Sequence, residues 1–416
     1  MMRKAGTRKA VRSESRTEPK DRGMSDWQTC AVPDSFVKNK VGRQNQIPAK
    51  EIAEVGRFPV VDQGQKFVAG YCDDESKVID FDLPLIIFGD HTRCFKYVDF
   101  PFVLGADGTK VLLPNKKLYD PKFYYFALLA LEIPSRGYNR HFTILSERSL
   151  PLPPLPEQKK IAHILSTVQR AIEAQERIIQ TTTELKKALM HKLFTEGLRN
   201  EPQKQTEIGP VPESWEVCKV GDVAKIQSGG TPTREDAENW NAGTIPWVKT
   251  GEINYSVIHD TEEKITPTGL ANSAARLFPK GTLLMAMYGQ GITRGRVGLL
   301  GIEAATNQAC ASITPTDKKR ISSVFLYYFF EYHYEDLRKL GHGANQRNMN
   351  AALIRSFPFA FPKPNEQTAV VTAFESLDQK RALHERKKTQ LQDLFRTLLH
   401  ELMTAKTRVH EFELSA

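Results

Sequence analysis

The stretch that decides the fold is Pro151-Leu-Pro-Pro-Leu-Pro156, which runs into Glu157-Gln-Lys-Lys-Ile-Ala162 and a segment without proline or glycine as far as Phe194. Proline is tolerated before a helix but breaks its interior, so the stretch predicts where a globular part ends and a helix begins. At a rise of about 1.5 Å per residue, residues 157–194 would form a rod of roughly 57 Å. A PxxP ligand for another domain is the competing interpretation.

A heptad-like apolar stripe follows this predicted helix, with polar Gln175 and Thr182 on the same seam. The stripe consists of Ile161, Ile164, Leu165, Val168, Ile172, Ile178, Ile179, Leu185, Leu189 and Leu193. Such a seam predicts a partner helix, which is either a second helix of this chain or another copy in a homo-oligomeric coiled coil.

The same junction occurs again 209 residues later, where Glu366-Gln367 matches Glu157-Gln158. Proline again comes first, in Phe361-Pro-Lys-Pro364, and the offset continues without a gap to the matching tripeptides that begin at His191 and His400. The second helix is predicted from Glu366 to about Thr404, with a much more polar middle at 380–388. The most economical arrangement is an antiparallel pair of these two helices.

Further matches upstream appear in the same order, with offsets that drift from about 188 to 209. They pair Trp27 with Trp215, Gly56–Gly64 with Gly243–Gly251, Leu83–Gly89 with Thr282–Gly289, Phe123–Phe126 with Leu326–Phe329, and Gly137–Asn139 with Gly343–Asn345. Ordered matches of this kind indicate a tandem duplication.

Each copy therefore comprises a mixed α/β globular part followed by a long helix, which predicts an α+β fold. Strands are expected around Leu85–Phe88, Leu283–Tyr288 and Ala311–Thr314, and helices around Asp120–Leu131 and Ser322–Leu340. The expected parts are a basic disordered extension (1–23), globular domain one (24–150), spacer helix one (151–196), a flexible linker (197–213), globular domain two (214–362), spacer helix two (363–408) and a tail (409–416). Because the first repeat begins just after Met24, we expect Met24 to be an alternative start.

Charge and composition set limits on the class of protein. The net charge of +9 is largely local, because residues 1–23 hold eight Lys and Arg against three acids. Bulk charge therefore says little about the folded body, although a basic arm of this kind is able to bind phosphate. No stretch approaches the roughly 18 apolar residues of a membrane span, and the basic N-terminus lacks the apolar segment of a secretory signal. Five scattered cysteines without a C-x-x-C pair are typical of free thiols in a prokaryotic cytoplasmic protein.

No catalytic motif survives inspection. Gly289-Gln-Gly-Ile-Thr-Arg294 begins like a dinucleotide fingerprint, but arginine takes the third glycine position and the segment lies between two predicted strands. Leu152-Pro-Pro-Leu155 lacks the amide or acid and the aromatic ring of an amine methyltransferase element. Glu75-Ser-Lys77 and Glu262-Glu-Lys264 resemble half of a nuclease site, yet such tripeptides are common in a chain with 26% charged residues.

The junction sequences resemble a known family. Gly137-Tyr-Asn-Arg-His-Phe142 and the stretch Leu150–Ala162 are similar to the domain-to-spacer junction of type I restriction–modification specificity (S) subunits. Ser228-Gly-Gly-Thr-Pro232, Ile245–Ile253 and Gly343–Asn350 are similar to that family's second target-recognition domain. The resemblance spans about Trp27 to Thr404, and its one departure is that copy one has no Gly-Gly-Thr-Pro counterpart.

What the resemblance implies is a non-catalytic, sequence-specific DNA-binding subunit. In that family each target-recognition domain reads half of an asymmetric bipartite site, and the paired helices set the gap between the halves. Two methyltransferase (modification) subunits and restriction/translocase subunits join it. No cofactor is expected on this chain, whereas S-adenosylmethionine, ATP and Mg²⁺ are expected in the partner subunits.

Candidate contacts to double-stranded DNA lie in glycine-rich loops, because base readout requires polar side chains on backbones that can approach closely. Copy two offers three clusters: Gln290, Thr293, Arg294 and Arg296; Asn345, Gln346, Arg347 and Asn348; and Ser228 and Thr231 with Lys249. Copy one offers Gln65, His91, Thr92, Arg93, Asn139, Arg140 and His141. Each of these residues is equally compatible with an ordinary solvated turn. Phosphate contacts are expected to outnumber base contacts.

Two other classes of protein compete with this interpretation. A fused restriction or methylation enzyme would need catalytic motifs that the sequence does not present. A stand-alone coiled-coil or DNA-binding regulatory protein fits the helices, but it leaves two large globular parts without a role.

Overall fold

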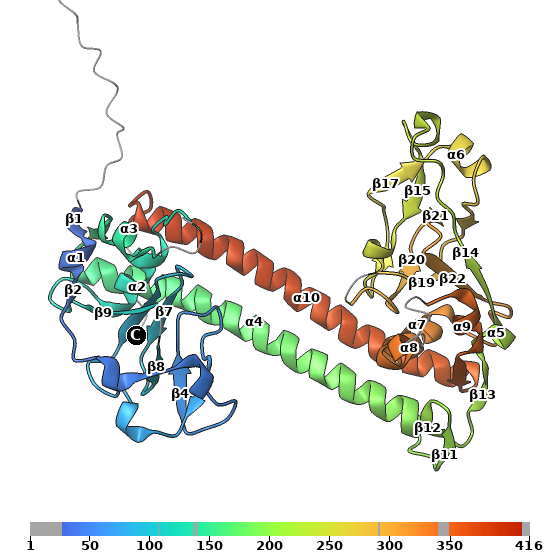
Figure 1. Cartoon of the computed structure of the whole chain (residues 1–416), viewed down its shortest axis with the longest axis horizontal. Coiled ribbons are helices and arrows are strands. Elements are labelled where there is room, and N and C mark those ends of the chain that lie inside the picture. Colours follow the sequence, from blue (N-terminus) through green and yellow to red (C-terminus); the bar gives the residue numbers. More distant parts are fainter. Residues whose placement is uncertain are drawn as a thin grey trace, which may run out of the picture. The chain divides into compact units, whose positions relative to one another are not determined.

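A computed structural model describes residues 27–106, 108–135, 137, 140–289, 292–339 and 349–409 (Figure 1). The chain forms two compact units: unit 1 takes in the chain up to Ala174 and from Lys387 onward, and unit 2 is Gln175–Arg386. Two long helices, α4 (Leu155–Glu196) and α10 (Pro364–Met403), each contribute one end to unit 1 and the other end to unit 2. The basic extension 1–23 lies outside the described residues.

Unit 1 contains two four-stranded sheets. The first has the order β2-β9-β6-β7, with β2 at Phe36–Val37, β9 at Thr109–Pro114, β6 at Leu85–Gly89 and β7 at Phe95–Val98. The second has the order β3-β8-β4-β5, with β3 at Gln46–Ile47, β8 at Val103–Gly105, β4 at Phe58–Val61 and β5 at Gly70–Cys72. Strand β6 is buried along its whole length, as its unbroken apolar sequence predicts.

The helices of unit 1 cover the first sheet and meet the long helices there. They are α1 (Val32–Ser35), α2 (Pro121–Leu129) and α3 (Phe142–Ser146), with 3₁₀ turns at Arg43–Asn45, Ala49–Glu51 and Glu75–Lys77. Asp120 caps α2 by accepting from the amides of Lys122 and Phe123. The main core of the unit joins α2 to β6, to the start of α4 and to the end of α10.

Unit 2 repeats this plan with one more strand. Its larger sheet has the order β14-β22-β19-β20-β16, with β14 at Ala224–Ser228, β22 at Cys310–Pro315, β19 at Leu283–Ala286, β20 at Val297–Leu300 and β16 at Val257–Ile258. Its smaller sheet has the order β17-β15-β21-β18, with β17 at Glu263–Ile265, β15 at Ile245–Val248, β21 at Ala304–Thr306 and β18 at Leu277–Phe278.

Three helices of unit 2, α5 (Val220–Val223), α7 (Ser323–Tyr332) and α9 (Ala351–Ser356), match the three short helices described in unit 1. Helices α6 (Pro267–Ala271) and α8 (Tyr334–Lys339) are additional, and 3₁₀ turns lie at Ala237–Asn239 and Thr250–Glu252. Helix α7 corresponds to α2, and Ser322 caps it in the way that Asp120 caps α2. The mixed fold expected from the sequence is therefore confirmed.

The segment expected to be a flexible linker is instead partly a β-hairpin. Strands β11 (Gln203–Thr206) and β12 (Gly209–Pro212) pair antiparallel. Gly209 has φ +97°, a conformation that suits glycine at the turn. Val211 is buried, and the Lys204 ammonium donates to the Trp215 carbonyl at 2.5 Å. The proline and glycine residues that indicated flexibility therefore shape a turn that packs on the core of unit 2.

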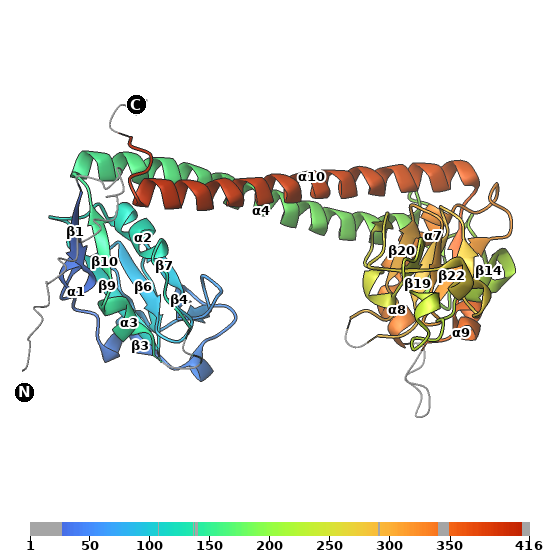
Figure 2. The same cartoon turned by 90° about the horizontal axis from the view of Figure 1, so that it is seen from above.

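The two long helices pair antiparallel within each unit, which confirms the expected helix pair (Figure 2). In unit 2, Phe194 stacks on Phe374 at 5.8 Å, and the Gln175 amide oxygen contacts His384 Nδ1 at 2.7 Å. Later residues of α4 therefore contact earlier residues of α10, as in an antiparallel pair. In unit 1, Ile161 and Leu165 share a core with Leu402. No helix in the described part of the chain is both long and apolar enough to cross a bilayer.

One residue of the predicted seam is misplaced. Leu185 leaves 53% of its surface exposed, whereas its neighbour Lys186 is buried. The Lys186 ammonium lies 2.8 Å from a Glu331 carboxylate oxygen and 2.9 Å from an Asp378 oxygen, and Tyr328 also donates to Asp378 at 3.0 Å. Burial raises the pKa of Glu331, while the nearby Lys186 lowers it. We call Lys186, Glu331 and Asp378 the ionic triad of unit 2.

Candidate DNA interface

The junction between globular part and helix is built from the same hydrogen bonds in both units. The Trp27 indole donates to Glu157 at 3.0 Å in unit 1, and the Trp215 indole donates to Glu366 at 3.2 Å in unit 2. One residue further along, the buried amide of Gln158 bonds the Asp120 amide and the Leu118 and Pro153 carbonyls. Gln367 makes the matching bonds to Ser322, Arg320 and Pro362. The repeated Glu-Gln pair therefore fixes each helix to its own globular part.

Beside this junction, a strand pair closes each globular part in the same way. In unit 1, β1 (Gln28–Ala31) pairs antiparallel with β10 (Ser149–Leu152). In unit 2, β13 (Glu216–Lys219) pairs antiparallel with β23 (Pro358–Phe361). The start and the end of each copy thus lie together at the root of its helix.

Several candidate residues of unit 1 come together in adjoining loops. The Gln63 side chain accepts from the His91 amide at 3.2 Å, and the Thr92 hydroxyl donates to the Gln63 carbonyl at 2.5 Å. Arg93, in the same β6–β7 loop, donates from Nη1 to the Ile133 carbonyl at 2.8 Å. Gln65 is exposed in the β4–β5 loop, and Arg140 is exposed before α3. The β6–β7 loop, which carries three of the candidates, is therefore tied to the β4–β5 loop and to the chain after α2.

His141 is the exception in unit 1, and its expected DNA contact is corrected. The side chain is fully buried, and its Nδ1 atom lies 2.9 Å from the Asp90 carbonyl oxygen. The His141 amide also donates to the Asp90 carboxylate at 2.8 Å. His141 therefore fastens the segment before α3 to the β6–β7 loop, and a buried ring is not available to a base edge.

In unit 2 one candidate of the β19–β20 loop contacts the chain that follows α7. Arg294 donates from Nη2 to the Arg338 carbonyl at 2.8 Å, and the Tyr334 hydroxyl donates to the Ile292 carbonyl at 2.5 Å. Arg296 instead donates to the Asn254 side chain at 2.6 Å, and Thr293 is half-buried. Residues 292–296 and α8 therefore lie in contact.

The two glycines of the Ser228-Gly-Gly-Thr-Pro232 motif lie where chain segments pack closely together. A Cβ atom on Gly229 would lie 2.0 Å from the Thr306 carbonyl oxygen, and one on Gly230 would lie 2.3 Å from the Ala274 carbonyl carbon. The buried Trp247 indole donates to the Gly230 carbonyl at 2.9 Å. Thr231 is hydrogen-bonded to Gln308. The glycines therefore let three chain segments meet, and they hold Ser228 at the surface.

Lys249 has carboxylate partners that weaken its candidacy. Its ammonium lies 2.8 Å from Glu262 and 2.9 Å from Glu263, and these hydrogen bonds raise its pKa to about 12. Glu263 also pairs with Arg234, whose guanidinium lies 3.9 Å from the centre of the Trp240 ring. Two acids already neutralise Lys249, so a phosphate would have to compete with them.

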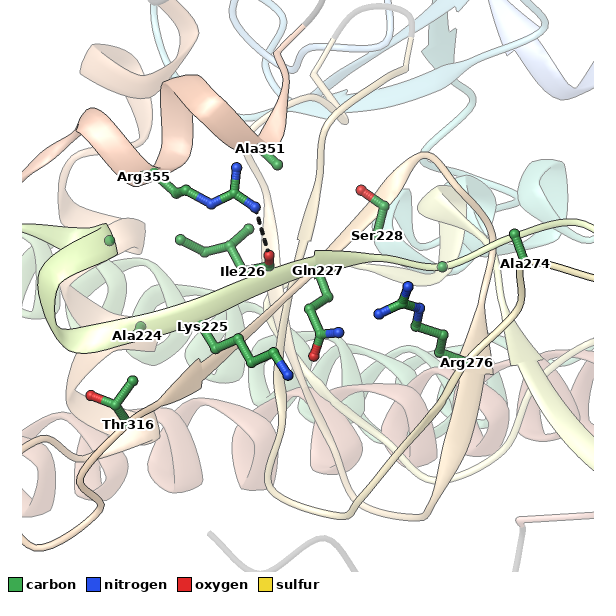
Figure 3. Close-up of a pocket in the computed structure, with 12 residues that line it drawn as sticks. Ala224, Lys225, Ile226, Gln227, Ser228, Ala274, Arg276, Thr316, Ala351 and Arg355 are labelled. Carbon is green, nitrogen blue, oxygen red and sulfur yellow. Dashed lines mark hydrogen bonds between the residues drawn. The ribbon is translucent and has the colours of Figure 1, made fainter.

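A groove of about 780 Å³ beside β14 contains basic residues that the sequence did not single out (Figure 3). Lys225 and Gln227 extend from one side of β14, where Arg276 lies near Gln227, whereas Ser228 and Arg355 lie on its other side. Arg355 donates to the Ile226 carbonyl at 3.0 Å. None of the described residues that line the groove is acidic. Residues 225 and 227 point to the same face because side chains alternate along a strand. That alternation around buried Ile226 was a usable signal in the sequence.

The remaining candidates fall outside the described residues. They are Asn139 in unit 1, and Gln290, Asn345, Gln346, Arg347 and Asn348 in unit 2. Within the described ranges, no group of three or more His, Cys, Asp or Glu side chains is arranged to hold a metal ion.

Comparison with known proteins agrees with this geometry. The type I restriction modification DNA specificity domain matches twice, at residues 24–183 and 212–393, which confirms the duplication. The chain is 28% identical over 412 residues to the type I restriction enzyme MjaVIII specificity subunit of Methanocaldococcus jannaschii, covering 92% of this chain and 93% of that protein. It is 22% identical over 340 residues to the EcoR124I/EcoR124II specificity subunit of Escherichia coli, covering 80% and 82%.

The fold has a solved counterpart in the crystal structure of the type I restriction–modification S subunit from M. genitalium. That structure aligns with a TM-score of 0.64 at 17% identity and covers 93% of this chain and 98% of its own. Two matches to one family domain account for most of the chain. The chain therefore belongs to the type I restriction–modification specificity family, as a DNA-recognition subunit that is not itself catalytic.

Proposed function

We propose that this chain reads an asymmetric bipartite DNA site, with one half contacted by unit 1 and the other by unit 2. The observation that carries the proposal is the duplicated junction, in which Trp27–Glu157 and Trp215–Glu366 join two globular parts to one helix pair by the same bonds. The loops beside the two junctions differ in length and residue type, so the half-sites should differ as well. The helix pair would set the number of unread base pairs between them.

The duplication also supports the proposed partners. Because the junction occurs twice, the chain offers two similar surfaces to which two identical proteins could bind, as expected for two methyltransferase subunits. Restriction/translocase subunits would join through these. S-adenosylmethionine, ATP and Mg²⁺ would be bound by those partners, and the assembly would act on chromosomal DNA in a prokaryotic cytoplasm.

The groove beside β14 is the best-supported phosphate contact in unit 2. Lys225 and Arg276 are exposed, and none of the described lining residues is a carboxylate that would neutralise them. Each phosphate contact contributes about 0.9 to the slope of log affinity against log salt concentration. Replacing Lys225 and Arg276 with glutamine should therefore lower that slope by roughly 2 if each contacts one phosphate. K249Q is the matched control, because Lys249 is already paired with Glu262 and Glu263, and it should leave the slope nearly unchanged.

The function itself is tested by co-expression with the modification subunits encoded beside it. Adenine methylation should appear at one asymmetric bipartite sequence and should disappear when this chain is omitted. Methylation of the same sequence without this chain, or methylation or cleavage of DNA by the purified chain alone, would contradict the proposal.

A further inference from the structure

An arginine lies in the corresponding loop of both units. Arg93 comes one residue before Cys94, whose carbonyl accepts from the Gly89 amide, and Arg294 comes two residues before Arg296, whose carbonyl accepts from the Ala286 amide. Both guanidinium groups donate at 2.8 Å to a main-chain carbonyl in the chain that follows the equivalent helix: Ile133 after α2, and Arg338 after α7. The contact is therefore part of the repeat, although the surrounding loops differ.

A second contact lies near each arginine and ties the same loop to the chain beyond the equivalent helix. In unit 1, His141 contacts Asp90 through both its ring and its amide. In unit 2, Tyr334 donates to the Ile292 carbonyl, and Arg338 donates from Nη1 to the Tyr334 hydroxyl at 3.0 Å. These partners are not alike in the two units, so the arginine–carbonyl contact is the shared element.

The chemistry of the contact suits a positioning role better than base readout. A guanidinium fixed to a main-chain carbonyl holds the backbone of the segment that supplies it, and charged donors make the stronger hydrogen bonds. Arg93 adopts a left-handed backbone conformation, with φ 62°. In unit 2 the neighbouring Gly295 takes that conformation instead, with φ +88°.

We propose that Arg93 and Arg294 are positioning residues that hold two DNA-facing segments of their unit as one surface. The segments are the β6–β7 loop and residues 130–135 in unit 1, and residues 292–296 and α8 in unit 2. This proposal rests on the function proposed above and adds a specificity role to it. Each arginine governs discrimination only in the half-site that its own unit reads.

The first test uses the free full-length chain and requires no DNA. R294A should speed amide hydrogen exchange in residues 333–339, and R93A should do so in residues 130–135, because the bond that holds each segment is lost. The melting temperature should stay within about 2 °C of wild type, because the bonds lie in half-buried loops outside the core. R294K, which keeps one donor, should restore much of the protection. Unchanged exchange in both alanine variants would overturn the proposal, whatever the fate of the proposed function.

The second test reads specificity in the methylome of cells that express the chain with its modification subunits. R294A should reduce discrimination against single base-pair changes by roughly tenfold in one half-site, within the range for one mismatch, and R93A should do so in the other half. R294K should recover most of it. Failure of R294K to recover any discrimination, with normal exchange, would identify Arg294 as a direct base contact and overturn the positioning role. If the wild-type chain directs no bipartite methylation, the proposed function fails instead.

Discussion

The two units hold the long helices by the same hydrogen bonds at the junctions. They differ at one contact between a long helix and the globular part, which is charged in unit 2 and mainly apolar in unit 1. Unit 2 buries the ionic triad Lys186, Glu331 and Asp378 under α7. The equivalent positions of unit 1, found by the same sequence offsets, are Phe395, Leu128 and Gln169. Phe395 there packs edge-on against Phe126 at 5.9 Å. One scaffold therefore tolerates either an apolar or a charged contact at this point, provided that each set is complete.

The C-terminal ends of α4 and α10 therefore need different surroundings. Lys186, near the end of α4, requires the two carboxylates that unit 2 provides, whereas Phe395, near the end of α10, requires the apolar surface of unit 1. Buried polar groups are known to specify register and partner in helix pairs. We expect the triad to favour one pairing of the helices over a shifted one.

The largest effect should follow from breaking the triad on one side only. K186M removes the ammonium between two half-buried carboxylates and leaves Arg381, whose guanidinium lies 3.7 Å from Asp378, so it should cost unit 2 about 3 kcal/mol in the free energy of unfolding. Lys186 lowers the pKa of Glu331 against the effect of burial, so that pKa should rise further in the variant, and the deficit should shrink as the pH falls through it. Urea unfolding at several pH values measures both, and a deficit that does not depend on pH would contradict the charge explanation.

A smaller effect should separate the two Trp–Glu junctions. Glu157 also accepts two bonds from Arg408, at 2.8 and 3.0 Å, whereas Glu366 is contacted by the Leu198 amide at 3.5 Å. E157Q should therefore cost about 2 kcal/mol and E366Q about 1 kcal/mol, since bonds between charged groups are the stronger ones. Denaturation of the two variants in parallel tests this order, and equal losses would show that Arg408 adds nothing.

The hairpin of unit 2 should respond weakly to a change at its turn. G209A places a Cβ on a residue with φ +97°, where open space lies around it. Only backbone strain is therefore expected, at roughly 1 kcal/mol. G251A is the matched control, because Gly251 also faces open space but has no positive φ. Thermal unfolding should shift for the first variant and not for the second.

The smallest effect should come from converting unit 2 to the chemistry of unit 1. A triple variant with K186F, E331L and D378Q replaces the whole triad, and complete replacement of a buried ion cluster is often neutral or stabilising by about 1–4 kcal/mol. The amide that D378Q introduces retains an acceptor for the Tyr328 hydroxyl. A loss as large as that of K186M would show that the two contacts are not interchangeable.

Much of this scaffold follows from sequence patterns. The helix expected over 157–194 is found at Leu155–Glu196, and the expected strands lie in place because they depend on local chemistry. The hairpin at 203–212, the burial of His141 and the exchange of Leu185 for Lys186 could not be predicted, since each depends on a partner distant in the sequence. The same reason explains why Lys249 looked free: Glu262 and Glu263 reach it only across paired strands β15 and β17.

The central claim is that two different units on one helix pair read two different half-sites. The most direct measurement is the methylome of cells in which residues 214–362 are replaced by a second copy of residues 24–150, expressed with the modification subunits. The account predicts a symmetric motif that repeats the half-site of unit 1 in inverted orientation, with the wild-type gap preserved to within a base pair or two. Methylation that still includes the original second half-site would contradict it.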